Sequence, residues 1–228
     1  MSAATVPTNP PLVCWSCHER TLGTHFCKSC GKLLQLPQSI DYFALFEMPR
    51  KLCFDMNALE QKFLQLSWKL HPDNFVNATE QERELSLKRS SELNDAHRTL
   101  RGPIARVEYL LTLEGARKEG EQKQTAPPEL LEEVFELNES LDEMREAKAA
   151  GGDIATLKAR LAEAEKNFQQ KLSEVDEQLK TAGRQWDAAE EENASEAHRR
   201  SIMTRLNELL NRRSYIRNLV INVEKELQ

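Results

Sequence analysis

NALEQKFLQLSWKLHPDNF, residues 57–75, is the stretch that decides the expected fold. Its apolar side chains recur every three or four residues, which is the spacing of one buried helical face. We expect the helix to end at His71, because Pro72 disfavours the α conformation in the preceding residue and has no N–H group to donate. A second helix is expected from about Thr79, where the same rhythm returns. The stretch therefore predicts a helical hairpin with an imidazole and a carboxylate, His71 and Asp73, on its polar turn.

The segments on either side of this hairpin make the pattern more specific. Residues 41–49 read DYFALFEMP, and residues 90–111 read SSELNDAHRTLRGPIARVEYLL. Helix, His-Pro-Asp turn and helix, flanked in this way, closely resemble the J-domain of DnaJ-type co-chaperones. The DYF and LF elements at the start and the RVEYLL element at the end resemble the HscB-type co-chaperones of iron–sulfur cluster assembly. Four matched flanking segments in the right order carry more weight than an isolated His-Pro-Asp tripeptide.

The resemblance implies a docking role for the His-Pro-Asp turn. A DnaK-type or HscA-type ATPase chaperone would bind there, and binding would favour its ATP-hydrolysing conformation. Two lysines on the exposed side of the first hairpin helix would add attraction to an acidic groove. The expected chaperone-binding residues are His71, Pro72, Asp73, Lys62 and Lys69. Trp68 lies among them, and its sequence position fits a contact residue and a core residue equally.

An enzymatic role for the same turn is the alternative. A His and an Asp two residues apart could belong to a hydrolase or to a metal site. No nucleophile elbow, Gly-rich phosphate loop or second His/Asp cluster accompanies His71 and Asp73. The sequence therefore predicts a protein that is not an enzyme and has no catalytic residues.

Composition and length suit a mainly helical, soluble protein. The chain has 228 residues, of which 30% are charged and 6% aromatic, and this length predicts one to two domains. No apolar run approaches the roughly 18 residues of a membrane span, so no membrane partner is expected. The N-terminal MSAATVPTNPP has neither a signal-peptide pattern nor the arginines of a transit peptide. Cytoplasm is the expected location, and the mitochondrial matrix is the alternative if a presequence is absent from this chain.

The net charge of −6 is concentrated in the second half of the chain. Residues 1–120 carry 15 basic and 14 acidic side chains, whereas residues 121–228 carry 16 and 23. Binding to a phosphate backbone relies on clustered Lys and Arg, so nucleic acid is not expected as a partner. An acidic surface instead favours a basic protein surface.

Two Cys-x-x-Cys pairs lie within residues 1–37 and predict a metal site. Each pair can hold one ion with two thiolates, and two pairs complete a tetrahedral site. The expected ligands are Cys14, Cys17, Cys27 and Cys30. Because all four positions are protein side chains, we expect a structural Zn²⁺ site, with iron in a rubredoxin-like site as the alternative. Two disulfides are the other alternative, and they would need an oxidising compartment. His18 and His25 are expected to be exposed, because the cysteines leave no ligand position vacant.

A second helical region follows a polar linker at residues 116–128. Its three helical patterns cover residues 129–150, 154–182 and 187–227, and the glycines at 151–152 and 183 mark the expected turns. This arrangement resembles the three-helix C-terminal domain of HscB-type proteins. The predicted fold is therefore all-α. A J-domain helical hairpin (residues 38–115) is followed by a three-helix bundle (129–228) and preceded by a small zinc-knuckle or zinc-ribbon module (1–37).

The first bundle helix combines a core stripe, an acidic stripe and an apolar pair at the margin between them. At 100° per residue, one face forms a core stripe, made of Val134, Leu137, Leu141 and Met144. A second face combines an apolar pair with glutamates, whose mutual repulsion costs roughly 0.2–0.5 kcal/mol a pair in a helix. A solvated face is one interpretation, and a binding surface for a basic-rimmed apolar partner is the other. The resemblance implies that this helix binds an IscU-type scaffold. The expected residues are Leu131, Glu132, Phe135, Glu136, Glu139 and Glu143, with Leu209 on the third helix as a weaker addition.

Together, these features predict a co-chaperone that binds an IscU-type scaffold and stimulates ATP hydrolysis by a DnaK/HscA-type chaperone. That stimulation would promote iron–sulfur cluster transfer and protein maturation. The tetracysteine module would then serve stability or a weak homodimer. Two other classes stay open, a general J-protein that delivers a different client and an interaction protein that recognises its partner through the zinc module.

Overall fold

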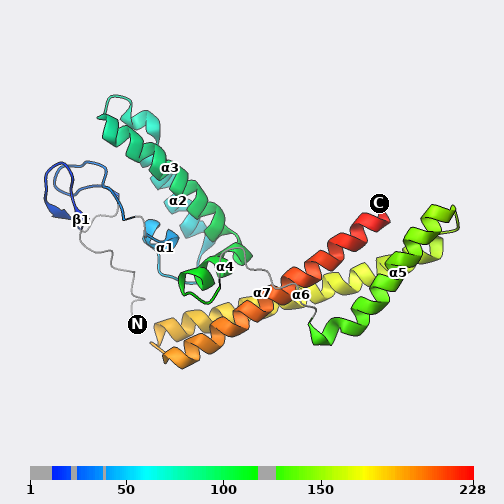
Figure 1. Ribbon diagram of the computed structural model, residues 1–228. Helices are drawn as coiled ribbons and strands as arrows, with labels where there is room; N and C mark the ends of the chain where they lie inside the picture. Colours follow the sequence, from blue (N-terminus) through cyan, green and yellow to red (C-terminus); the bar gives the residue numbers. More distant parts are fainter. Residues whose placement is uncertain (1–11, 22–24, 38–39, 118–126) are drawn as a thin grey trace. The chain divides into compact units, whose positions relative to one another are not determined.

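The computed structural model describes residues 12–21, 25–37, 40–117 and 127–228 (Figure 1). Most of the predicted linker and parts of the N-terminal module lie outside these residues. The chain divides into two units. Unit 1 contains the described residues up to Glu114 together with residues 186–194, and unit 2 contains those of 115–185 and 195–228. Helices make up nearly all of the regular structure, so the predicted all-α class is confirmed.

The centre of unit 1 is the predicted helical hairpin, formed by α2 (Met56–Leu70) and α3 (Glu80–Arg101) (Figure 1). The Thr79 hydroxyl caps α3 by accepting from the Glu82 N–H at 3.3 Å, as expected of an N-cap threonine. Between the helices lies the short 3₁₀ helix η1 (Pro72–Phe75). The buried side chains that join the two helices are Leu59, Leu70, Leu93, Ala96 and Leu100.

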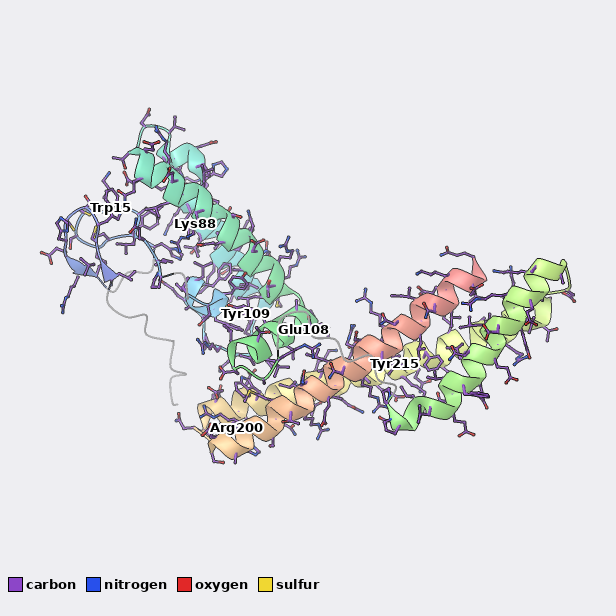
Figure 2. All side chains as sticks on the ribbon, viewed as in Figure 1. Trp15, Lys88, Glu108, Tyr109, Arg200 and Tyr215 are labelled. Carbon is purple, nitrogen blue, oxygen red and sulfur yellow. The ribbon has the colours of Figure 1, made fainter. Side chains whose placement is uncertain are left out.

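Two shorter helices close unit 1, α1 (Tyr42–Leu45) and α4 (Pro103–Leu113). The ring of Tyr109 on α4 (Figure 2) stacks on Tyr42 with centroids 4.4 Å apart. Its hydroxyl accepts from the Tyr42 N–H at 2.9 Å, and burial raises the pKa of Tyr109 to about 12. Asp41 caps α1 and also pairs with Arg50 at 2.6 Å. The first and last segments of the J-domain motif are thus held together by direct contacts.

The N-terminal module is a small two-stranded element, β1 (Leu12–Val13) antiparallel to β2 (Arg20–Thr21). A further bridge joins Phe26 to Leu33. In the described part of the module, the apolar cluster contains Leu34, Cys14 and Cys27, with Leu12 and Cys17 packed against them. So small a core is insufficient to stabilise a module by itself.

Unit 2 is built from η2 (Pro128–Leu130), α5 (Leu131–Ala150), most of α6 (Ala155–Glu191) and α7 (Glu196–Leu227). Figure 1 shows α6 and α7 running alongside each other, and Arg213 of α7 pairs with Asp176 of α6 at 2.5 Å. Core side chains come from all three helices and include Leu137, Met144, Leu161, Phe168, Leu206 and Ile216. Among the helices of the described residues, none has the length and hydropathy of a bilayer-spanning segment.

The turn predicted at Gly183 is wrong. The α6 helix continues through Gly183 to Glu191, and α7 begins only after Ser195, whose hydroxyl accepts from the His198 N–H. Glycine inside a helix costs about 1 kcal/mol relative to alanine. The nearby Trp186 side chain is buried, and tertiary packing of this kind, more than intrinsic propensity, stabilises helices in proteins. Local sequence signals such as a glycine do not report the burial of a side chain by distant parts of the chain.

Candidate functional site

The four cysteines predicted as metal ligands lie together. Their sulfur atoms are all within 4.8 Å of one another. The Cys14–Cys30 and Cys17–Cys27 pairs each have sulfurs 3.6 Å apart. A tetrahedral ion with Zn–S bonds of about 2.3 Å sets its sulfur ligands about 3.8 Å apart. The donor set therefore fits a tetrahedral metal ion. No disulfide joins these four cysteines, so the structure does not support the disulfide alternative.

Two similar turns present these sulfurs. The Cys14 carbonyl accepts from the His18 N–H at 2.9 Å, and the Cys27 carbonyl accepts from the Gly31 N–H at 2.9 Å. His18 and Gly31 both have positive φ, 60° and 74°, a conformation that glycine adopts more easily. Donation from the Cys30 backbone N–H lowers the pKa of the Cys27 thiol to about 6. At Cys17 a backbone N–H also lowers the thiol pKa, but burial and the neighbouring sulfurs outweigh it and raise the pKa. A lowered thiol pKa favours the thiolate form that binds metal.

The module packs against the J-domain hairpin within unit 1, and His25 is part of this contact. The prediction that His25 is exposed is wrong, because only 5% of it is accessible to solvent. Its Nε2 lies 2.9 Å from the Leu45 carbonyl, and burial lowers its pKa to about 4. A carbonyl can only accept, so the neutral ring carries its proton on Nε2. The cysteine motif shows that all four ligand positions are filled, but it does not show that His25 contacts α1.

An ion pair also joins the module to α3. The Lys32 ammonium donates to the buried Glu82 carboxylate at 2.6 Å. Trp15 (Figure 2) reinforces the module itself by donating its indole N–H to the Leu33 carbonyl at 2.8 Å. The tetracysteine module therefore contacts both α1 and α3.

The His-Pro-Asp residues form an exposed turn between α2 and α3. His71 ends α2, and its Nδ1 accepts from the Asp73 N–H at 3.3 Å. The Asp73 carboxylate lies 3.5 Å from the same nitrogen, and 86% of its side chain is exposed. An imidazole and a carboxylate are thus presented to solvent on a short 3₁₀ turn that begins with Pro72.

Side chains beneath this turn hold it in place. The Ser86 and Ser90 hydroxyls donate to the Leu70 carbonyl at 2.7 and 3.1 Å. The Asn74 side-chain amide donates to the Trp68 carbonyl at 2.6 Å. These contacts satisfy carbonyls that the end of α2 would otherwise leave unpaired. The two serines were not predicted, although their i, i+4 spacing on the inner side of α3 was a usable signal.

The two lysines predicted to attract the chaperone have different environments from each other. Lys69 is exposed, as expected. Lys62 is half-buried, and its ammonium donates to the Phe46 and Glu47 carbonyls at 2.8 and 3.0 Å. Lys62 therefore caps the end of α1, so it is less available for long-range attraction than the sequence suggested.

The outer face of α2 also presents large apolar side chains. Trp68 is 77% exposed, and Leu64 lies exposed one turn earlier on the same face. The open choice for Trp68 between core and surface is therefore decided in favour of the surface. Exposed apolar side chains beside the His-Pro-Asp turn are suited to contact another protein.

The residues predicted on α5 fall on the expected faces. The core stripe is confirmed, because Val134, Leu137, Leu141 and Met144 are all buried. Phe135 is 72% exposed, and Leu131 is exposed one turn before it. The four predicted glutamates, Glu132, Glu136, Glu139 and Glu143, are exposed. The helix thus brings an apolar pair and acidic side chains together on its surface.

Two of the predicted scaffold-binding residues have different environments from those expected. Glu143 pairs with Arg160 of α6 at 2.7 Å, so part of the acidic stripe is neutralised within the chain. Leu209 is only 7% exposed and belongs to the core of unit 2. A helical wheel of one helix cannot show which of its residues a neighbouring helix pairs or covers.

No family model matches this chain. Two curated relatives, described as co-chaperone protein HscB homologues of Vibrio vulnificus strains YJ016 and CMCP6, are each 35% identical over 150 residues. The match covers 66% of this chain and 85% of each relative. The chain belongs to the HscB family of co-chaperones.

Solved HscB structures share the architecture. The crystal structure of human co-chaperone protein HscB aligns with a TM-score of 0.65 at 25% identity, and covers 93% of this chain and 97% of the human one. Chaperone HscB from Vibrio cholerae aligns with a TM-score of 0.50 at 26% identity, over 82% of this chain and 96% of its own. The HscB resemblance read from the His-Pro-Asp stretch and its flanks is therefore confirmed.

Replacing Glu82 with Gln should weaken the contact between module and hairpin in a pH-dependent way. Burial opposes ionisation of Glu82, but the hydrogen bond and charge of Lys32 outweigh it and hold the Glu82 pKa below its usual 4.5. A carboxyl with a lowered folded-state pKa stabilises the fold above its usual pKa, and this stabilisation disappears as the pH falls through the folded-state pKa. Thermal unfolding at neutral pH should show a loss of about 1.5–3 kcal/mol.

The pH series provides the control for this prediction. The difference between wild type and Glu82→Gln should persist down to pH 4.5 and shrink below it. Glu80→Gln makes the same chemical change at an exposed position in the first turn of α3 and should have little effect at any pH. An equal loss for both variants would contradict a specific role for the Lys32–Glu82 pair.

Proposed function

We propose that this HscB-family chain binds an IscU-type scaffold and stimulates ATP hydrolysis by a DnaK/HscA-type chaperone. In this way it promotes transfer of iron–sulfur clusters to recipient proteins. The exposed His-Pro-Asp turn carries the proposal, because its imidazole and carboxylate are held in place but left open to solvent. The clusters are cargo of the partner proteins, and the chain itself supplies no catalytic group.

The chaperone contact is assigned to the turn and the adjoining face of α2. Asp73 would pair with a basic residue of the chaperone, His71 would donate or accept a hydrogen bond, and Pro72 sets the backbone of the turn. Trp68 adds apolar contact area next to these polar groups. Tighter binding to the ATP-hydrolysing conformation than to the others would shift the chaperone toward it.

The scaffold contact is assigned to the exposed face of α5. Phe135 and Leu131 would enter an apolar site on the scaffold, and the glutamates beside them, Glu132, Glu136 and Glu139, would pair with its basic rim. Glu143 would take part only by sharing its charge with Arg160. Leu209 is left out of the contact surface because it is buried.

The metal is assigned as a structural zinc ion. Cys14, Cys17, Cys27 and Cys30 would hold it, and a site with four thiolates leaves no position open for a substrate. The ion would supply folding energy that the small module lacks. Metal analysis of the purified chain distinguishes zinc from iron, since a rubredoxin-like iron site would be coloured and redox-active.

Calorimetric titration with the IscU-type scaffold tests the α5 assignment. The double variant Phe135→Ala, Glu136→Ala of the full chain should bind the scaffold about 1–3 kcal/mol more weakly, as expected for a small hot spot. A control variant, Glu84→Ala with Leu87→Ala, removes an exposed acid and an exposed apolar side chain from α3 and should bind normally. If the unmodified chain does not bind the scaffold, the iron–sulfur assignment fails and the client is a different protein.

A further inference from the structure

A cleft of about 320 Å³ lies where the tetracysteine module meets the J-domain hairpin. The module contributes His25 and Phe26, and α2 contributes Lys62, Gln65, Leu66 and Lys69. This volume is at the lower end of the range for ligand-binding pockets. The cleft lies entirely within unit 1.

The cleft has apolar walls and a positive charge. Phe26 and Leu66 are half-buried in its walls. Lys62 and Lys69 both line it, against a single carboxylate from Glu47. The Lys62 ammonium already donates to the Phe46 and Glu47 carbonyls, so Lys69 is the more available charge. Within the described residues neither lysine has a carboxylate at ion-pair distance. An acidic segment with an apolar side chain would complement both features.

The histidine in the wall of the cleft fixes the module against α1. The Nε2–H group of His25 is engaged by the Leu45 carbonyl. Its Nδ1 is buried and has no hydrogen-bond donor in the described part of the protein. The ring therefore belongs to the fixed wall of the cleft, where it joins the module to the end of α1.

We propose that this cleft extends the chaperone-binding surface, so that the tetracysteine module forms one of its walls. The occupant is an acidic, apolar segment of the ATPase chaperone, and this inference rests on the proposed function. Lys62 and Lys69 are separated by about 10 Å of helix at 1.5 Å per residue. Lys69 lies two residues before His71. A chaperone docked on the His-Pro-Asp turn therefore reaches Phe26 by following α2.

The module then has a role in recognition as well as in stability. The His25–Leu45 and Lys32–Glu82 contacts hold Phe26 opposite α2. Folding of the module around its metal completes the cleft, and without the metal α2 would present only one wall. Partner binding would then involve the tetracysteine module, which lies outside the J-domain motif.

The test measures the dissociation constant of the full-length, metal-loaded chain for the chaperone. Phe26→Ser removes an apolar wall, and Gln65→Glu places a negative charge in the cleft on an exposed helical position. Each should raise the dissociation constant at least fivefold. Val13→Ser alters an exposed apolar residue of the module outside the cleft, and Asn94→Asp adds a negative charge on α3. Both controls should stay within twofold of wild type.

The outcomes separate this inference from the proposed function. Normal chaperone binding by Gln65→Glu overturns the inference, even if Phe26→Ser loses metal and cannot be interpreted. A change in oligomeric state without a change in chaperone affinity also overturns it, in favour of a second copy as occupant. A wild-type chain that neither binds nor stimulates the chaperone refutes the proposed function itself.

Discussion

Substituting His71 by Gln is expected to abolish stimulation of the chaperone's ATPase while leaving scaffold affinity unchanged. The imidazole is exposed and accepts from the Asp73 N–H, so it fixes the local shape of the turn and is itself available for contact. Glutamine has a flexible amide and cannot reproduce the planar ring acceptor at this position. Single-turnover ATP hydrolysis by the chaperone should return to the rate measured without co-chaperone.

The matching control concerns stability and the second surface. Because His71 is exposed, its replacement should change the free energy of unfolding by no more than about 0.5 kcal/mol. Calorimetric binding of the scaffold should match the wild type, since α5 lies in the other unit. Loss of both activities would refute the assignment of chaperone and scaffold binding to separate units.

Removal of the metal is expected to unfold the tetracysteine module. Its interior is too small to be stable alone, and in comparable peptides metal binding supplies on the order of 10 kcal/mol. Cys27→Ser should have the same effect as chelation, because it removes one of four thiolates. The fluorescence of Trp15, whose indole N–H is bonded to the Leu33 carbonyl, should report the loss of structure.

The hairpin should survive this treatment. The α2 and α3 helices are joined by their own buried leucines, so far-UV circular dichroism should change little. Cys53→Ser is the matched control, because Cys53 is exposed and outside the cluster, and it should retain one metal ion per chain. A chain that keeps its module fluorescence after complete metal removal would contradict a structural role for the ion.

Local patterns predicted the helices of the J-domain well. α2 ends at His71 before Pro72, and α3 begins after Thr79, because each of these signals acts within one turn of the backbone. The cysteine spacing predicted the sulfur cluster for the same reason, since each pair needs only a short turn. In these cases the deciding interactions lie within a few residues of the signal.

The remaining differences arise from contacts between elements. His25 is buried and contacts Leu45 of α1, Lys62 is engaged by the end of α1, and Leu209 is covered within unit 2. Glu143 is neutralised by Arg160, which lies 17 residues away in sequence. A sequence pattern reports the face on which a residue lies. It does not report which residue of another helix meets that face.

The contact between Tyr42 and Tyr109 has a mechanical and topological consequence. These residues lie near the two ends of the J-domain, and their stacked rings and hydrogen bond join those ends directly. Tension applied between the two ends would act on the Tyr42–Tyr109 contact before it reached the α2–α3 hairpin. Domains whose termini lie close together tolerate circular permutation and insertion into loops of other proteins. The Tyr42–Tyr109 contact therefore makes this J-domain a suitable domain for such an insertion.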